Sequence, residues 1–152
     1  MSAGVGIDLV DVGRRYETPG GVVRAVDGVH LRVPPGESLA ITGPSGCGKS
    51  TLLGLIAGLD VPTTGTVSID GREISSMPDE DRACIRRHDI GLVFQSDNLL
   101  PFLTATENVS VQLSLDDRDG GHTRSVAILS RSGLADDIDK LPDQLSGGER
   151  QR

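Results

Sequence analysis

The pattern of apolar and polar residues predicts strands in the first two thirds of the chain. Stretches that alternate or concentrate β-branched and apolar residues are separated by Gly, Pro and Asp. We expect six strands, at residues 5–12, 22–26, 29–33, 38–42, 66–69 and 90–94. The early ones are joined by tight connections such as Asp27-Gly28 and residues 34–36. Because parallel neighbours need long crossovers, these connections predict an antiparallel sheet.

The fourth expected strand, 38–42, continues differently from the others. It runs into a glycine-rich loop and then into an apolar helical stretch at 49–59. A strand, a loop and a helix in this order form the basic unit of α/β folds. The first part of the chain is therefore expected to combine an antiparallel β region with an α/β unit.

After Gln95 the pattern becomes helical. Thr104 and Glu107 have the spacing of a capping box, which opens a helix that runs to about residue 113. A polar turn at 116–121 precedes a second helix at 123–132, which Gly133 can end in the left-handed conformation. A break at 141–145 is followed by a new helix start at Ser146. We expect a β-rich lobe at 1–95 and a helical lobe at 96–152.

Composition narrows the class of protein. The chain of 152 residues is 36% apolar and 24% charged, as in ordinary globular proteins, and its longest apolar run is far shorter than the roughly 20 residues of a membrane-spanning helix. The amino terminus lacks the basic and apolar parts of a secretory signal, so we expect a cytoplasmic location. The net charge of −7 argues against a nucleic-acid-binding surface.

A phosphate-binding loop is the clearest chemical motif. The pattern of Gly, four residues, Gly, Lys and Ser or Thr predicts that the phosphates are held by Gly43, Pro44, Ser45, Gly46, Cys47, Gly48, Lys49, Ser50 and Thr51. Glycines let the backbone amides point inward, and the following helix presents its positive end to the same anion. Lys49, one of only two lysines in the chain, is expected to reach the β and γ phosphates, and the Ser50 hydroxyl to bind Mg²⁺.

A second motif follows about one hundred residues later, at 145–149. Ser146 and Glu149 again have the spacing of a capping box, and Gly147 and Gly148 leave the amides of the first turn open to a phosphate. A P-loop alone is compatible with kinases, GTPases and many ATPases. The Leu-Ser-Gly-Gly-Glu sequence at this distance resembles the signature of the ABC ATPase family.

The resemblance to ABC nucleotide-binding domains covers essentially the whole chain, and it implies two further site residues. Gln95 occupies the place of the family's Q-loop glutamine, which meets Mg²⁺ and the attacking water and senses the transmembrane partner. Tyr16, the only tyrosine, stands where an aromatic residue of the family stacks on adenine. The alternative for Tyr16 is a half-buried strand tyrosine. The runs 90–95, 98–101, 103–104 and 107–109 are most similar to the lipoprotein-release and macrolide-efflux branch.

The resemblance implies an α/β fold, in which a P-loop NTPase core has an antiparallel β subdomain and a helical subdomain. It implies ATP and Mg²⁺ as cofactors, a head-to-tail dimer with a second nucleotide-binding domain, and integral-membrane permease subunits as partners on the cytoplasmic face. Hydrolysis would couple to transport through the permease.

The sequence departs from the family at its end. The chain stops at Arg152, three residues beyond Glu149, before the Walker B acids and the switch histidine that the family places after the signature. We therefore expect a fold without its carboxyl-terminal strands and no hydrolysis by this chain alone. The alternatives are a non-hydrolytic ATP-binding fragment and a soluble ABC protein that does not act in transport.

Overall fold

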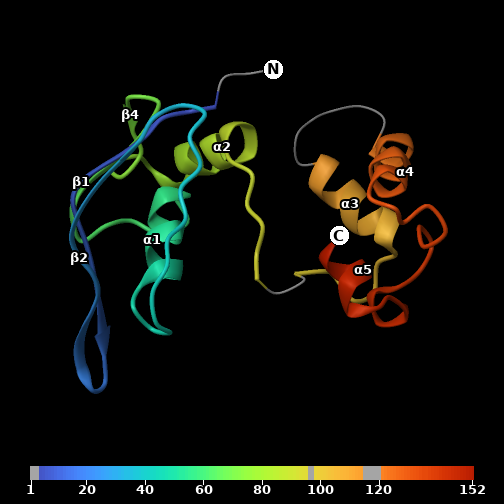
Figure 1. The fold of residues 1–152 in the computed structure, drawn as a ribbon, viewed down its shortest axis with the longest axis horizontal. Helices are drawn as coiled ribbons and strands as arrows, with labels where there is room; N and C mark the ends of the chain where they lie inside the picture. The colour runs from blue at the N-terminus through green and yellow to red at the C-terminus, as the bar shows by residue number, and fades with distance from the viewer. Residues whose placement is uncertain (1–3, 96–97, 115–120) are drawn as a thin grey trace. The chain divides into compact units, whose positions relative to one another are not determined.

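The computed structural model describes residues 4–95, 98–114 and 121–152. The chain divides into two compact units, Met1–Gly91 and Leu92–Arg152 (Figure 1). Each unit has its own group of buried apolar residues. The units are therefore described separately.

The first unit is built on an antiparallel sheet. Its strands are β1 (Ile7–Thr18), β2 (Gly21–Val33), β3 (Thr64–Ile69) and β4 (Arg72–Glu73), in the order β2-β1-β3-β4. The antiparallel prediction is confirmed, but the two strands expected at 22–26 and 29–33 form one strand. Asp27 and Gly28 make a bulge and not a turn, because Arg14 pairs with Val26 and Val12 with Val29.

The long hairpin of β1 and β2 extends past the rest of the sheet. β3 pairs with β1 only as far as Gly13, which lies opposite Thr64. Beyond that point residues 14–18 pair with β2 alone, from Arg14 opposite Val26 to Thr18 opposite Gly21. We call residues 14–18 and 21–26 the ribbon; it is the blue hairpin that projects from the sheet in Figure 1. A two-stranded ribbon is only marginally stable without further contacts.

Two helices supply the other side of the core of this unit. These are α1 (Lys49–Ile56) and α2 (Asp79–Asp89), and their buried residues, Leu55 and Ile85, join Leu9, Val67 and other sheet residues in one cluster. The sequence pattern did not predict α2, because Ile85 is the only buried residue of that helix. Charge placement was the available signal: three acids occupy its first turn and three basic residues its last, which suits the helix dipole.

Two expected strands, 38–42 and 90–94, are not strands among the described residues. Neither segment has regular secondary structure, and Leu39 and Val93 are 53% and 96% exposed. An extended segment becomes a strand only when a neighbour takes up its backbone hydrogen bonds, and the described sheet offers none to either segment. The strand of the α/β unit expected before the P-loop is therefore not part of the described sheet.

The second unit is helical, as expected. It contains α3 (Ala105–Ser114), α4 (Gly121–Arg131), a 3₁₀ turn η1 (Pro142–Gln144) and α5 (Gly147–Gln151). A small core formed by Ala105, Leu129, Leu134 and Leu145 holds them together. The amides of Ala105 and Thr106 donate to the carbonyls of Lys140 and Ile138, which fixes the segment before the signature against the start of α3.

Two local predictions in this unit are confirmed. The amide of Thr104 donates to Glu107 Oε2 at 2.8 Å and the amide of Glu107 donates to Thr104 Oγ1 at 3.2 Å, which completes a capping box. Gly133 has φ 74° just after α4. The expected polar turn at 116–121 lies outside the described residues except for Gly121. In the part of the chain that the structure describes, no helix is long and apolar enough to cross a membrane.

Candidate nucleotide site

The phosphate-binding loop ends at α1 in a conformation that leaves the helix start open. Gly48 is the residue before the helix and has φ 90°, and no side chain caps the first-turn amides. A Cβ on Gly48 would collide with the carbonyl group of Ala25 in β2. The loop therefore packs against the ribbon at a position that only glycine fits. Open amides at a helix start are suited to an anion.

Lys49 lies across its own loop. Its Nζ donates to the carbonyl oxygens of Gly43 at 2.9 Å and Pro44 at 2.7 Å, and it lies 3.6 Å from Cys47 Sγ. These neutral acceptors are weaker partners for an ammonium group than phosphate oxygens, because charge-assisted hydrogen bonds are stronger. The next residue, Ser50, is exposed on the first turn of α1. The loop thus places a cation, a hydroxyl and open amides together.

Tyr16 lies on the ribbon, in a cluster that the sequence did not predict. Its hydroxyl donates to Asp60 Oδ2 at 2.8 Å, and the guanidinium carbon of Arg14 lies 4.7 Å from the ring centroid. Arg14 also binds both oxygens of Asp60, at 2.9 Å and 2.7 Å. Tyr16 is half-buried, so both the strand tyrosine and the stacking residue remain compatible with its position.

The signature segment forms the expected capping box. The Ser146 side chain accepts from the amide of Glu149 at 3.3 Å, and Glu149 Oε2 accepts from the amide of Ser146 at 2.7 Å. The hydrogen bond from the Ser146 amide, followed by that from its side chain, lowers the pKa of Glu149 below its ordinary value. Gly147 and Gly148 form the first turn of α5, with open space where a Cβ would stand.

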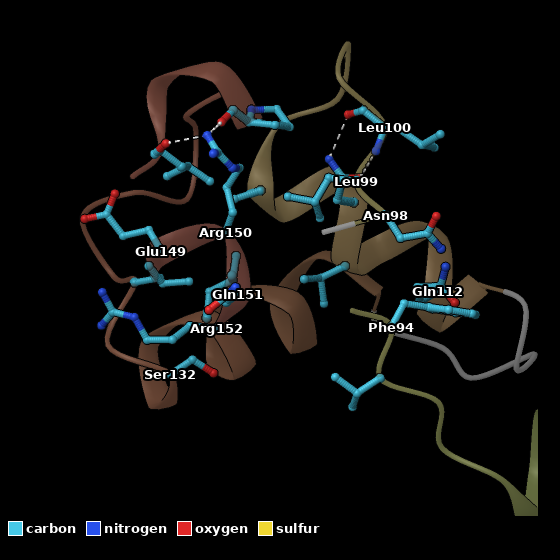
Figure 2. A pocket seen from close by; sticks show the side chains of 18 of the residues that line it. Phe94, Asn98, Leu99, Leu100, Gln112, Ser132, Glu149, Arg150, Gln151 and Arg152 are labelled. Carbon is cyan, nitrogen blue, oxygen red and sulfur yellow. Dashed lines mark hydrogen bonds between the residues drawn. The ribbon is translucent and has the colours of Figure 1, made fainter. Parts of the chain in front are cut away.

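The helix α5, which begins within the signature, is held to η1 by hydrogen bonds. Arg150 donates from one nitrogen to the carbonyl oxygens of Leu145 and Pro142, at 2.9 Å and 3.3 Å (Figure 2). Leu145 is buried in the core of the second unit, so the start of α5 is held on both sides. These contacts therefore hold the turn that contains the signature glycines, although α5 itself has only five residues.

Gln95 is exposed on the segment that follows residue 91, and no strand ends there. The expectation of a glutamine at a strand end is corrected accordingly. Tyr16 and the P-loop belong to the first unit, whereas Gln95, Ser146 and Glu149 belong to the second. Each unit thus contributes its own group of expected site residues.

A cavity of about 750 Å³ lies in the second unit and not at the P-loop. Phe94, Gln112, Ser132 and Arg152 are among the residues that line it (Figure 2). None of residues 43–51 is among those that line this cavity.

The chain is similar in sequence to known proteins. A family model described as ABC transporter matches residues 26–152. The lipoprotein-releasing system ATP-binding protein LolD of Pseudomonas fluorescens is 42% identical over 144 residues, which cover 93% of this chain and 63% of the relative. The macrolide export ATP-binding/permease protein MacB of Syntrophobacter fumaroxidans is 40% identical over 151 residues, covering 96% of this chain and 21% of the relative.

The comparison with solved structures gives the same family as the comparison of sequences. The dimeric structure of MJ0796, a bacterial ABC transporter cassette, superposes with a TM-score of 0.87 at 38% identity, and the match covers 95% of this chain and 65% of that one. A post-hydrolysis state of MJ0796 bound to ADP and Pi gives a TM-score of 0.88. This chain has the ABC cassette fold over the part of the cassette that it spans, and its resemblance to the lipoprotein-release and macrolide-efflux branch is confirmed. The chain belongs to the ABC transporter family, as part of an ATP-binding domain.

Proposed function

We propose that this chain holds the phosphates of MgATP in its P-loop, as the ATP-binding part of an ABC ATPase. The observation that supports this most directly is the start of α1, where the first-turn amides have no side-chain cap and Lys49 lies across the loop on weak acceptors. An arriving phosphate would give both the amides and the ammonium group charged partners.

Each of the expected site residues binds a different part of MgATP. Lys49 neutralises the β and γ phosphates, the Ser50 hydroxyl is a ligand for Mg²⁺, and Tyr16 stacks on adenine. The family resemblance gives Gln95 the role of the Q-loop glutamine. When bound at Ser50, Mg²⁺ would supply positive charge that stabilises phosphoryl transfer.

We place the signature at a shared site. Ser146, Gly147 and Gly148 would meet the γ phosphate bound by the P-loop of a second nucleotide-binding domain, in a head-to-tail pair. The dimeric state of MJ0796 supports this arrangement. Permease subunits would use ATP binding and hydrolysis for transport, with this chain on the cytoplasmic face of the membrane. The combined ATP-binding/permease protein MacB supports the coupling.

The test is nucleotide binding by calorimetry with a matched lysine control. Lys49→Ala should abolish detectable MgATP binding and leave the circular dichroism spectrum unchanged, because the Lys49 side chain points across the loop and not into the core. Lys140→Ala removes the chain's only other lysine, which pairs with Asp137 in the second unit, and should bind like the parent. Equal affinity of the parent and Lys49→Ala would refute the phosphate role.

A turnover assay tests the catalytic part of the proposal. Phosphoryl transfer needs an oriented water and a second hold on the metal as well as bound phosphates. The chain spans about two thirds or less of its relatives. The family resemblance implies that those groups come after the signature. We expect the 152-residue chain to bind MgATP without turnover. Turnover that Lys49→Ala abolishes would show that these residues suffice for hydrolysis.

A further inference from the structure

A polar cluster of Arg14, Tyr16 and Asp60 connects the ribbon to the end of α1. Asp60 accepts from the Tyr16 hydroxyl at 2.8 Å and from Arg14 Nε at 2.9 Å on the same oxygen. Its other oxygen lies 2.7 Å from a terminal nitrogen of Arg14. The side chains of Arg14 and Asp60 are 23% and 28% exposed, so this bidentate pair is partly withdrawn from water. Such a pair holds its geometry better than a surface ion pair.

The cluster is placed where the ribbon needs support. Beyond Gly13, β1 has β2 as its only strand neighbour among the described residues, so the backbone alone holds Tyr16 loosely. Asp60 lies just after α1, and its amide donates to the carbonyl of Gly54 in that helix at 3.3 Å. The Tyr16 ring is therefore tied to the same helix that begins with Lys49.

The loop that follows Asp60 adds a second connection. The amide of Thr63 donates to the carbonyl of Gly13 at 2.7 Å, and the amide of Arg15 donates to Thr63 Oγ1 at 3.0 Å. These bonds fix the base of the ribbon, whereas Asp60 fixes the aromatic ring itself. The two connections differ in kind, because only the Asp60 contact acts on a side chain that could touch a ligand.

Arg14 determines which face of the ring a ligand can use. Its guanidinium lies over one face, 4.7 Å from the centroid, and the hydroxyl edge is engaged by Asp60. A base that stacks on this ring must approach the opposite face. A cation on one face also restricts tilting of the ring, since cation–π contact is favourable only near the ring normal.

We propose that Asp60 is a positioning residue for the nucleobase. It holds the hydroxyl of Tyr16, and it holds Arg14 over the ring face opposite the one on which the base stacks. The Tyr16 ring is thereby kept at a fixed place relative to the P-loop. This inference rests on the proposed function, because it takes Tyr16 as the stacking residue. It assigns a role to two side chains, Arg14 and Asp60, that touch neither the base nor the phosphates.

The experiment compares a ligand that has a base with one that lacks it. Affinities for MgATP and for magnesium tripolyphosphate are measured by calorimetry on the 152-residue chain and its variants. Asp60→Ala should weaken MgATP on the order of 5- to 20-fold, within what one stacked base contributes, and change tripolyphosphate less than about twofold. Asp60→Asn keeps an acceptor for the Tyr16 hydroxyl and should fall between Asp60→Ala and the parent.

The matched control is Asp27→Ala. Asp27 is an exposed carboxylate beside the ribbon that lies 3.6 Å from Arg24, so its removal also breaks an aspartate–arginine pair. It should leave both affinities unchanged. Tyr16→Phe removes the bond to Asp60 but keeps the ring, and it should weaken MgATP less than Tyr16→Ala does. In the Tyr16→Ala background, the loss of Asp60 should have no further effect on MgATP.

A spectroscopic measurement follows the ring directly. The chain has one tyrosine and no tryptophan, so its intrinsic emission comes from Tyr16 alone. MgADP should quench this emission in the parent, after correction for absorbance with free tyrosine, and tripolyphosphate should not. In Asp60→Asn the quenching by MgADP should require higher nucleotide concentrations.

The outcomes separate the inference from the function on which it rests. Equal loss of both ligands in Asp60→Ala and Asp60→Asn would mean that Asp60 supports the P-loop and not the ring, and would overturn the inference. Unchanged MgATP affinity in both variants would also overturn it. A parent chain that binds tripolyphosphate no better than Lys49→Ala would instead refute the phosphate site itself, and the inference with it.

Discussion

At the scale of single residues, Gly48 is the position with the least freedom in the P-loop. Its backbone is left-handed, with φ 90°, and a Cβ there would overlap the carbonyl group of Ala25. The cost has two parts: an L-residue pays roughly 1–2 kcal/mol for the left-handed conformation, and β2 or the loop must move to make room. The loop geometry and the packing of β2 therefore depend on the same glycine.

Gly48→Ala should lower the free energy of unfolding of the first unit by about 2 kcal/mol or more and weaken MgATP binding. The matched control is Gly54→Ala in the middle of α1, where a Cβ would meet nothing within 4 Å. That change should raise stability by about 0.5–1 kcal/mol, because alanine is the better helix former. Urea unfolding measures both, and equal effects of the two substitutions would contradict the account.

At the scale of elements, the capping box contributes a larger share of the stability of α5 than of a longer helix, because α5 has only five residues. Glu149 accepts from the Ser146 amide more strongly when its carboxylate is ionised, which is why the pKa of Glu149 is lowered. Because the pKa of Glu149 is lower in the folded chain, the ionised carboxylate stabilises the capping box. This stabilisation is fully present at pH values above the ordinary glutamate pKa. This stabilisation is lost as the pH falls through the lower, folded value.

The amide proton of Ser146 should therefore shift in NMR spectra during acidification, with a midpoint below the ordinary pKa of a glutamate. Glu149→Gln keeps an acceptor without a titrating proton, and its Ser146 amide should not move in that range. A midpoint at or above the ordinary value would show that the box does not favour the ionised form.

The elements also show what can be predicted from sequence. The two capping boxes and the Gly133 helix end were predicted, because each depends on residues within three or four positions of one another. Residues 38–42 have strand composition, but a strand requires a neighbour that the described sheet does not supply. Local composition cannot reveal whether such a neighbour is present.

The candidate site also has features that the sequence predicts and features that it does not. The P-loop and signature were readable as contiguous motifs, whereas the contact of Tyr16 with Asp60 spans 44 residues. Nothing in the spacing of those two residues indicates that they meet. The α2 helix was missed for a different reason, since its single buried residue leaves no apolar periodicity to detect.

At the scale of the whole molecule, the two units have separate cores of unequal size. Among the described residues, eight buried residues form the cluster of the first unit and four form that of the second. Because buried apolar area sets most of the stability, the second unit should unfold at a lower urea concentration than the first. Two-state unfolding of the whole chain is then not expected.

This expectation can be measured with one probe in each unit. Tyr16 emission follows the first unit, and the NMR amide signals of α4 follow the second. The α4 signals should disappear first as urea is raised. Coincident curves from the two probes would mean that the chain unfolds as one cooperative body.

The ribbon has a further consequence, for hydrogen exchange along a single strand. β1 is continuous from Ile7 to Thr18, yet its first half has strand neighbours on both sides and its second half on one. Backbone amides at 14–18 can thus open by local fraying, whereas those near Leu9 open only when the core does. One strand would then contain both fast and slowly exchanging amides, and the Asp60 contact, made by a side chain, would slow the fast ones.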